Sequence, residues 1–172
     1  MFAAIAAMML SGCGNSVEPS SSAEPSDHVE PSGSVEEIYY PDGSYALDEY
    51  DADGYITKET WYNPDGSIDF WVEFEYDADG NQTKQTYYNP DGTIDYWVEY
   101  EYDAHGSITK ETGYNPDGSL SYEYEYDGHG NQTKGTWYNS DGTIDCWFEF
   151  EYDTDGNTVK ETWYNSDGTI RE

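Results

Sequence analysis

A tandem repeat of 24–26 residues occupies most of the chain after residue 48 and constrains its fold more than any other feature. Four copies cover residues 49–74, 75–100, 101–124 and 125–150, and a shorter fifth copy covers residues 151–172. Each copy begins with Glu-Tyr-Asp and contains two short segments that end in glycine. A fixed period of this length indicates that each copy forms the same structural unit and packs against its neighbours.

The two glycine segments of each copy predict tight β-hairpin turns. Asn63-Pro64-Asp65-Gly66 suits a three-residue loop, because proline fixes its own φ and glycine accepts the positive φ that follows. Asp77-Ala78-Asp79-Gly80 has the same pattern without proline. The runs between turns alternate aromatic or β-branched residues with polar residues at period two, which is typical of strands. Residues 36–172 are therefore predicted to form an all-β domain: an elongated, twisted antiparallel β-meander of about 11 strands in a single-layer or curled sheet.

Three-residue loops also predict which residues share a face of the sheet. Tyr62 is expected opposite Ile68 and Thr60 opposite Phe70, so that one face carries the Phe and Val residues together with one lysine per copy. The other face is expected to carry the carboxylates and all six tryptophans. The third copy lacks two residues, and an even deletion leaves the faces unchanged. Cys146 replaces the aromatic residue found at Phe70, so it is expected to be a packed thiol.

Tryptophans beside carboxylates suggest two uses of this surface. Flat rings stack on sugars and carboxylates accept hydrogen bonds from hydroxyl groups, so the surface could bind carbohydrate or a cell-wall polymer. Alternatively, the rings cover the sheet, pair with one another across strands and contact protein partners. The candidate binding residues are Trp61, Trp71, Tyr87, Trp97, Trp137, Trp147 and Trp163.

The first 35 residues differ in composition from the repeats. Residues 1–10 are all apolar, and the segment Leu10-Ser11-Gly12-Cys13 at the end of this run resembles the lipobox of bacterial lipoproteins. The resemblance implies a signal peptide over residues 1–12 and acylation of Cys13. Residues 13–35 are rich in Glu, Pro and Ser and predict a disordered tether. A lipid-anchored, extracytoplasmic protein of the bacterial cell envelope is therefore expected, with the membrane as a partner through the anchor.

The acidic charge excludes some functions. Six Lys and Arg stand against 37 Asp and Glu, which gives a formal net charge of −31. This charge opposes nucleic-acid binding, and loosely bound cations are expected instead. Asp51-Ala52-Asp53-Gly54 is similar in sequence to part of a twelve-residue calcium-binding loop, but Thr60 occupies the position where such a loop needs a bidentate glutamate. Asp-Gly turns explain the pattern, so no specific metal site is predicted.

No enzymatic activity, catalytic residue or cofactor is predicted. A catalytic site needs a unique set of side chains in a pocket, whereas nearly every polar residue here recurs in each copy. The exceptions are His105, His129 and Cys146, and both histidines occupy turn positions far along the chain from the cysteine.

The motif at the start of each copy resembles the YD (Rhs-type) repeats of bacterial surface and toxin-delivery proteins. The matching segments include Tyr76-Asp77-x-x-Gly80-x-x-Thr83 and Tyr102-Asp103-x-x-Gly106-x-x-Thr109. The resemblance implies a long, winding β-sheet and a surface setting; a weaker resemblance is to choline- or glucan-binding repeats. The expected function is a structural or interaction scaffold with a glycan or protein partner. The alternative is a carbohydrate-binding module.

Overall fold

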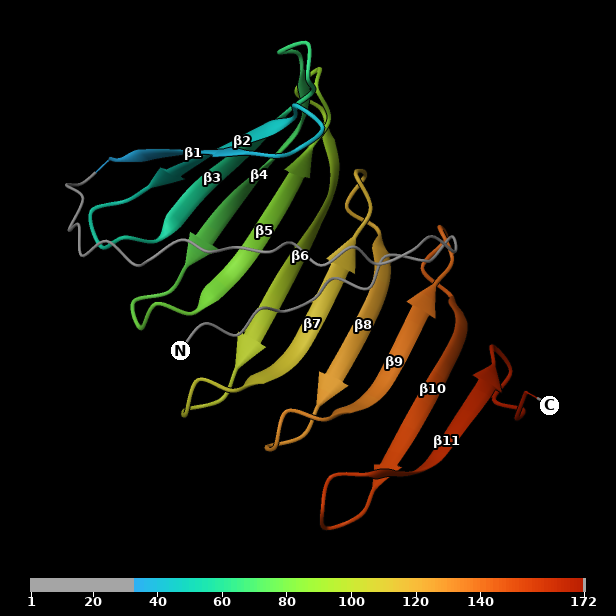
Figure 1. The fold of residues 1–172 in the computed structure, drawn as a ribbon. Helices are drawn as coiled ribbons and strands as arrows, with labels where there is room; N and C mark the ends of the chain where they lie inside the picture. The colour runs from blue at the N-terminus through green and yellow to red at the C-terminus, as the bar shows by residue number, and fades with distance from the viewer. Residues whose placement is uncertain (1–32, 172) are drawn as a thin grey trace.

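A computed structural model describes residues 33–171, which form one antiparallel sheet of 11 strands (Figure 1). The strands are β1 (Val35–Tyr39), β2 (Tyr45–Tyr50), β3 (Ile56–Tyr62), β4 (Ile68–Tyr76), β5 (Gln82–Tyr88), β6 (Ile94–Tyr102), β7 (Ile108–Tyr114), β8 (Leu120–Tyr126), β9 (Gln132–Tyr138), β10 (Ile144–Tyr152) and β11 (Thr158–Asn165). Their order in the sheet is their order in the chain, so the predicted meander is confirmed. The predicted signal peptide and nearly all of the predicted tether lie outside the described residues. Within the described part, no helix is long and apolar enough to cross a membrane.

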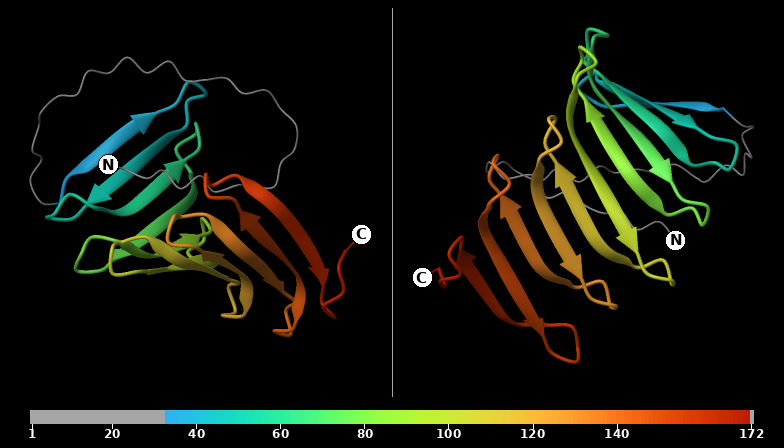
Figure 2. Two further views of the ribbon diagram at one scale, coloured as in Figure 1. Left: turned by 90° about the horizontal axis from the view of Figure 1, so that it is seen from below. Right: turned by 180° about the vertical axis from the view of Figure 1, so that it is seen from behind.

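The sheet is strongly twisted and curled, with β1 and β11 at its two free ends (Figure 2). Each strand pairs through its backbone only with the strands that precede and follow it in the chain. The structure is therefore held together locally, repeat by repeat, as in other repeat architectures.

The turns have the predicted geometry. In the β3–β4 turn, the Gly66 N–H donates to the Asn63 carbonyl at 2.9 Å and the Asn63 N–H donates to the Ser67 carbonyl at 2.8 Å. Gly66 has φ of 81°, a conformation that costs glycine nothing and other residues more. These bonds define the three-residue loop expected from Asn-Pro-Asp-Gly.

A β-bulge follows almost every turn, and it makes the predicted pairing of the strands wrong by one residue. Tyr62 lies opposite Ile68 as expected, but Trp61 lies opposite Phe70, so Asp69 is an extra, bulged residue. The β4–β5 hairpin repeats the pattern with Thr83 as the bulge. Every hairpin except β1–β2 contains such a shift. Because side chains alternate between faces, a one-residue shift turns the odd-numbered strands over relative to the prediction.

The bulges provide one extra side-chain hydrogen bond each where threonine occupies them. Thr83 donates its hydroxyl to the Glu75 carbonyl at 3.2 Å, across the hairpin. The same bond, at the same length, is made by the bulge residues Thr57, Thr109 and Thr133. The Thr-Lys pair that follows four of the five Asp turns is thus a sequence signal for the bulge.

The two faces of the sheet differ in what they bury. The face that we call the core face buries Ala46, Val72, Val98, Tyr100 and Phe148. The opposite face, which we call the threonine face, buries a row of threonines: Thr60, Thr86, Thr112 and Thr136. Three of these threonines lie opposite a tryptophan of the next strand. Each face has a single layer of side chains. Among the described residues, none larger than alanine is completely buried.

The corrected register divides the tryptophans between the faces. Trp61, Trp137 and Trp163 lie on the core face, and Trp71, Trp97 and Trp147 lie on the threonine face. Tyr87 is on the core face, opposite Val72. The prediction that one face carries all six tryptophans is therefore wrong. So is the prediction that lysines and carboxylates point to opposite faces, because Lys84 lies directly opposite both Glu75 and Glu99 on the threonine face.

Candidate functional site

The tryptophans of the threonine face each stack on a tyrosine of the following strand. The ring centroids of Trp71 and Tyr88 are 5.1 Å apart, and their planes differ by 11°. Trp97–Tyr114 and Trp147–Tyr164 repeat this stack at 5.0 and 4.9 Å. In the register expected from three-residue loops, Trp71, Trp97 and Trp147 would instead lie opposite Tyr87, Gly113 and Trp163, each one residue away from the observed partner. Such pairs are worth about 0.5–1.5 kcal/mol beyond the area that they bury.

Two of these rings are also covered on their other side by a lysine. Lys58 of β3 places its Nζ 5.4 Å from the centroid of the Trp71 ring, while Tyr88 covers that ring from β5. Lys84 stands over Trp97 at the same distance. A ring held between a cation and another aromatic ring has no open face on which a sugar can stack. The arrangement therefore favours a structural role for Trp71 and Trp97.

The candidate residues of the core face are paired in a similar way. Trp61 lies between Tyr40, at 5.0 Å, and Phe70, at 5.7 Å. Tyr87 stacks on Tyr96 of β6 at 4.1 Å.

At the C-terminal end, the structure brings two candidate residues together across an intervening strand. The rings of Trp137 on β9 and Trp163 on β11 are 5.8 Å apart and nearly parallel. The buried Phe148 of β10 contacts both of them. The seven candidate binding residues thus form separate structural pairs instead of one platform.

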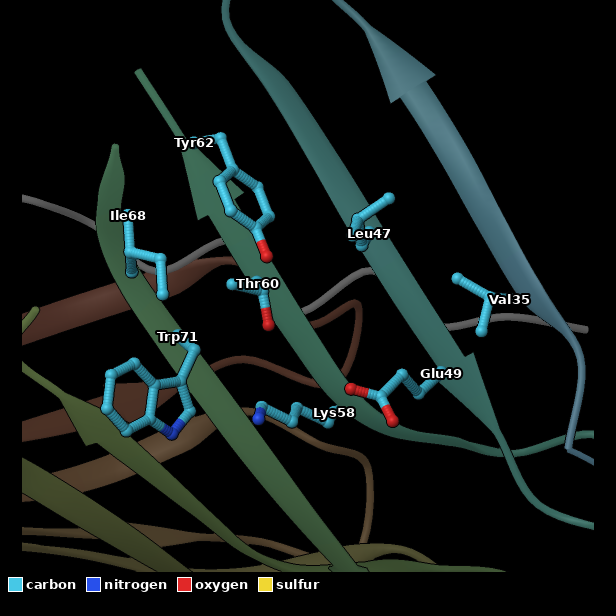
Figure 3. Close-up of a pocket in the computed structure, with 8 residues that line it drawn as sticks. All are labelled: Val35, Leu47, Glu49, Lys58, Thr60, Tyr62, Ile68 and Trp71. Atoms are coloured by element: carbon cyan, nitrogen blue, oxygen red, sulfur yellow. The ribbon is translucent and has the colours of Figure 1, made fainter. Parts of the chain in front are cut away.

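A surface hollow of about 300 Å³ on the threonine face is lined by residues of β1–β4 (Figure 3). Lys58 and Glu49 lie near one end, and Tyr62 and Ile68 lie toward the other. Leu47 contributes to the apolar wall at a position where β4 has Glu73 and β6 has Glu99. A second hollow, over β4–β8, is lined mainly by charged side chains. The first hollow is thus the more apolar of the two.

The acidic residues at the turns are engaged in turn hydrogen bonds. The Asp77 carboxylate accepts the N–H groups of Asp79 and Asn81, both at 2.9 Å. Asp65 accepts the N–H and the hydroxyl of Ser67 at 3.0 and 2.6 Å. These hydrogen bonds, above all those from the Asn81 and Ser67 side chains, lower the pKa of Asp77 and Asp65. Within residues 33–171, no group of three or more His, Cys, Asp and Glu is placed to hold a metal ion.

Acidification should therefore unfold the protein through its turns. A carboxylate with a lowered folded-state pKa stabilises the fold above its ordinary pKa, and that contribution is lost as the pH falls through the folded value. We expect the urea midpoint to fall steeply below about pH 4. Asp77→Asn should weaken the protein at neutral pH and reduce the acid loss. The control Asp79→Asn removes a carboxylate of the same turn for which the structure shows no such bonds, and an equal effect there would contradict the account.

Lysines of the threonine face pair with glutamates across strands. Lys84–Glu99 and Lys134–Glu125 are 3.7 Å apart, and Lys160–Glu151 is 2.6 Å apart. Lys110 pairs with Glu123 in the same way. Exposed pairs of this kind contribute little to stability, so they mainly offset part of the excess negative charge.

The tyrosines of three of the five Glu-Tyr-Asp motifs share a structural role that sequence reasoning missed. Tyr76, Tyr102 and Tyr152 donate their hydroxyls to the carbonyls of Ile56, Gln82 and Gln132, at 2.9, 2.7 and 2.6 Å. Each carbonyl belongs to the first residue of the preceding strand, next to the bulge. Burial raises the pKa of Tyr76, which favours the protonated, donating phenol. In all three cases the tyrosine lies 20 residues after the residue whose carbonyl accepts its hydroxyl.

The residues that do not recur form no common site. Cys146 is half-buried on the core face between Trp137 and Asn165, and burial raises the pKa of its thiol. Its position agrees with a packed thiol. His105 and His129 lie in turns, where their backbone N–H groups donate to the carboxylates of Asp103 and Asp127 at 2.8 Å.

Comparison with known proteins adds a family and two distant structures. A family model described as "Protein of unknown function (DUF2963)" matches residues 39–75, 71–113, 114–154 and 138–172. No curated protein matches the chain.

The solved structures share little identity with this chain. The crystal structure of TcdB2-TccC3-Cdc42 is matched with 16% identity and a TM-score of 0.44 over 76% of this chain and 9% of that one. A porin-like protein from Bacteroides uniformis is matched with 14% identity and a TM-score of 0.36, over 76% of this chain and 54% of that one. At such scores, neither likeness supports a functional argument.

Proposed function

We propose that this chain, which belongs to the DUF2963 family, is a non-catalytic interaction scaffold displayed at the bacterial cell envelope. One observation carries the proposal: the polar side chains that recur in every copy are engaged in holding the sheet. The turn aspartates accept turn N–H groups, the lysines pair with glutamates, and Trp71 and Trp97 lie between a lysine and a tyrosine. Such a chain offers a repeated surface for binding a partner, and the recurring side chains do not form a distinct catalytic set.

The organisation that we propose follows from the N-terminal sequence. Acylated Cys13 holds the protein on the membrane, residues 13–35 act as an extended acidic tether, and residues 36–172 form the displayed sheet. The Tyr-Asp motif and the winding sheet support kinship with YD (Rhs-type) surface proteins. The formal charge of −31 favours partners that carry positive charge or are bridged by loosely bound cations.

The anchor is tested by detergent phase partition of the full chain and of Cys13→Ala, produced in a bacterial host. We expect the wild-type protein in the detergent phase and Cys13→Ala in the aqueous phase, because only an acyl chain makes this acidic protein amphiphilic. Cys146→Ala is the matched control for a thiol that is not lipidated, and it should partition like the wild type. Wild-type protein in the aqueous phase would refute the anchor.

Carbohydrate binding is the second candidate, and the hollow in Figure 3 favours it. Tyr62 supplies an aromatic ring there, while Lys58, Glu49 and Thr60 supply hydrogen-bonding groups. A glycan array of bacterial cell-wall polymers tests this candidate. Saturable binding that is lost in Tyr62→Ala would support it over the scaffold proposal.

A further inference from the structure

Strand β2 departs from the repeat at two adjacent positions. It reads Ala46-Leu47-Asp48-Glu49, whereas β4 reads Val72-Glu73-Phe74-Glu75. The acidic and apolar residues have thus exchanged places, so Asp48 lies on the core face where the later copies have an aromatic residue. Those aromatic residues are Phe74, Tyr100, Tyr124 and Phe150.

Asp48 is buried there and faces two other carboxylates. Only 5% of its surface is exposed, and its Oδ1 atom is buried without a hydrogen-bond partner in the structure. Glu36 of β1 and Glu59 of β3 are its direct neighbours on either side. A row of three acids therefore crosses the core face at the N-terminal end of the sheet.

The surrounding groups provide no positive charge. Lys58 precedes Glu59 in β3 but points to the threonine face, opposite Glu49 and Glu73. Strand β4 contributes the apolar Val72 to this row. The other titratable groups that face the acids are phenols: Tyr40, which precedes the β1–β2 turn, Tyr50 of β2, whose hydroxyl donates to Glu36 at 3.1 Å, and Tyr87 of β5.

Two adjacent carboxylates in such surroundings are unfavourable when both are ionised. Residues directly opposite on antiparallel strands have their Cβ atoms about 4.5–5.5 Å apart, and like charges at this distance repel. Burial raises the pKa of Asp48, and Glu36 raises it further. Burial also raises the pKa of Glu59, with Asp48 as the second cause. A single proton between the two groups removes one charge and gives the unpartnered oxygen a hydrogen bond.

We propose that Asp48 and Glu59 share a proton and make the β1–β3 end of the sheet a pH-sensitive joint. While the pair holds its proton, β1 and β2 are bound firmly to β3. When both groups ionise, their repulsion loosens the two N-terminal strands, which are joined to the rest of the sheet by the pairing of β2 with β3.

The direction of the effect follows from linkage. A carboxyl group with a raised folded-state pKa stabilises the fold at pH values below its ordinary pKa, and this contribution is lost as the pH rises through the raised value. The joint therefore responds in the opposite direction to the turn aspartates. The joint loosens as the pH rises through the raised pKa of the pair, whereas the turns lose stability as the pH falls.

Carboxyl ¹³C titration of the full chain tests the shared proton directly. We expect one of the two carboxyl signals to titrate clearly above the ordinary range of about 4, in a step that both residues sense. Hydrogen exchange then tests the joint. The protection factors of β1 and β2 amides, relative to those of β6 and β7, should fall by about tenfold or more between about pH 5 and pH 8.

Matched variants distinguish an effect of the Asp48–Glu59 pair from an effect of the overall negative charge. Asp48→Asn and Glu59→Gln should each abolish the alkaline loss of protection, and Asp48→Phe, which restores the residue type of the repeat, should do the same. Glu111→Gln is the control, because Glu111 holds the same repeat position but lies opposite Tyr100. Independent titration of both carboxyls near the ordinary value, or retention of the alkaline loss in both Asp48→Asn and Glu59→Gln, would overturn the proposal.

Discussion

Phe148→Ala is expected to lower the free energy of unfolding by about 3–5 kcal/mol, the cost of truncating a buried aromatic residue. Phe148 is 5% exposed and lies on the core face of β10. Its ring centroid is 5.4 Å from that of Trp137 and 5.1 Å from that of Trp163. The opposing residue on β9 is Gly135, which has no side chain to fill the resulting cavity.

Urea unfolding followed by far-UV circular dichroism measures this loss. Because each strand pairs only with its neighbours in the chain, we expect β9–β11 to detach before the rest of the sheet in this variant. Trp147→Ala, the adjacent residue on the threonine face, is the control: it removes a half-buried ring and one stack with Tyr164, and should cost less. A larger loss for Trp147→Ala would show that the two faces have been assigned the wrong way round.

Gly135→Val is expected to destabilise the protein by about 1–3 kcal/mol, the usual cost of overpacking. A Cβ atom on Gly135 would lie 2.4 Å from Cε1 of Phe148 and 3.0 Å from Cδ1 of Tyr124. The Phe148 ring cannot move aside freely, because Trp137 and Trp163 flank it. The glycine thus makes room for the aromatic side chain of the next strand.

A thermodynamic cycle checks this clash. Adding Phe148→Ala to Gly135→Val should cost clearly less than Phe148→Ala alone, because the valine fills part of the cavity. Gly128→Ala is the matched glycine control, since a Cβ there meets nothing within 4 Å. That substitution should be neutral or stabilise by about 0.4–1 kcal/mol. Additive losses for the two β9–β10 substitutions would contradict the proposed contact.

Much of the fold could be predicted because turns and alternation are local. Asn-Pro-Asp-Gly and Asp-x-x-Gly specify their own backbone geometry, and the strands between them are too short for another arrangement. The strand count and the meander follow from these signals alone. The family match over residues 39–172 and the observed sheet agree with this part of the prediction.

The pairing between strands could not be read in the same way. Bulges at residues such as Asp69 and Thr83 break the alternation at one position, so that the residues on either side of the bulge face opposite sides of the sheet. An analysis of one strand at a time does not detect that break. Phe70 and Trp71 were correctly placed on opposite faces, but Trp61 was placed on the wrong one. The proposed tryptophan platform depended on this pairing and is divided between the two faces.

Some structural roles depend on contacts between residues far apart in the chain. The hydroxyl bond from Tyr76 to the Ile56 carbonyl, and the burial of Asp48 beside Glu59, require the true register. Asp48 still had a visible signal, since it is an acid where the other copies have an aromatic residue. A departure from a repeat therefore marks a position whose environment needs separate examination.

We propose that the aromatic rings hold the sheet together and do not form a glycan-binding surface. Trp97 tests it best, because Tyr114 and Lys84 cover the two sides of its ring. Trp97→Ala and the wild-type chain should be compared by urea unfolding and on one array of cell-wall polysaccharides. We expect the variant to be less stable and neither protein to show saturable binding. Saturable wild-type binding that disappears in a Trp97→Ala protein of unchanged stability would contradict the claim.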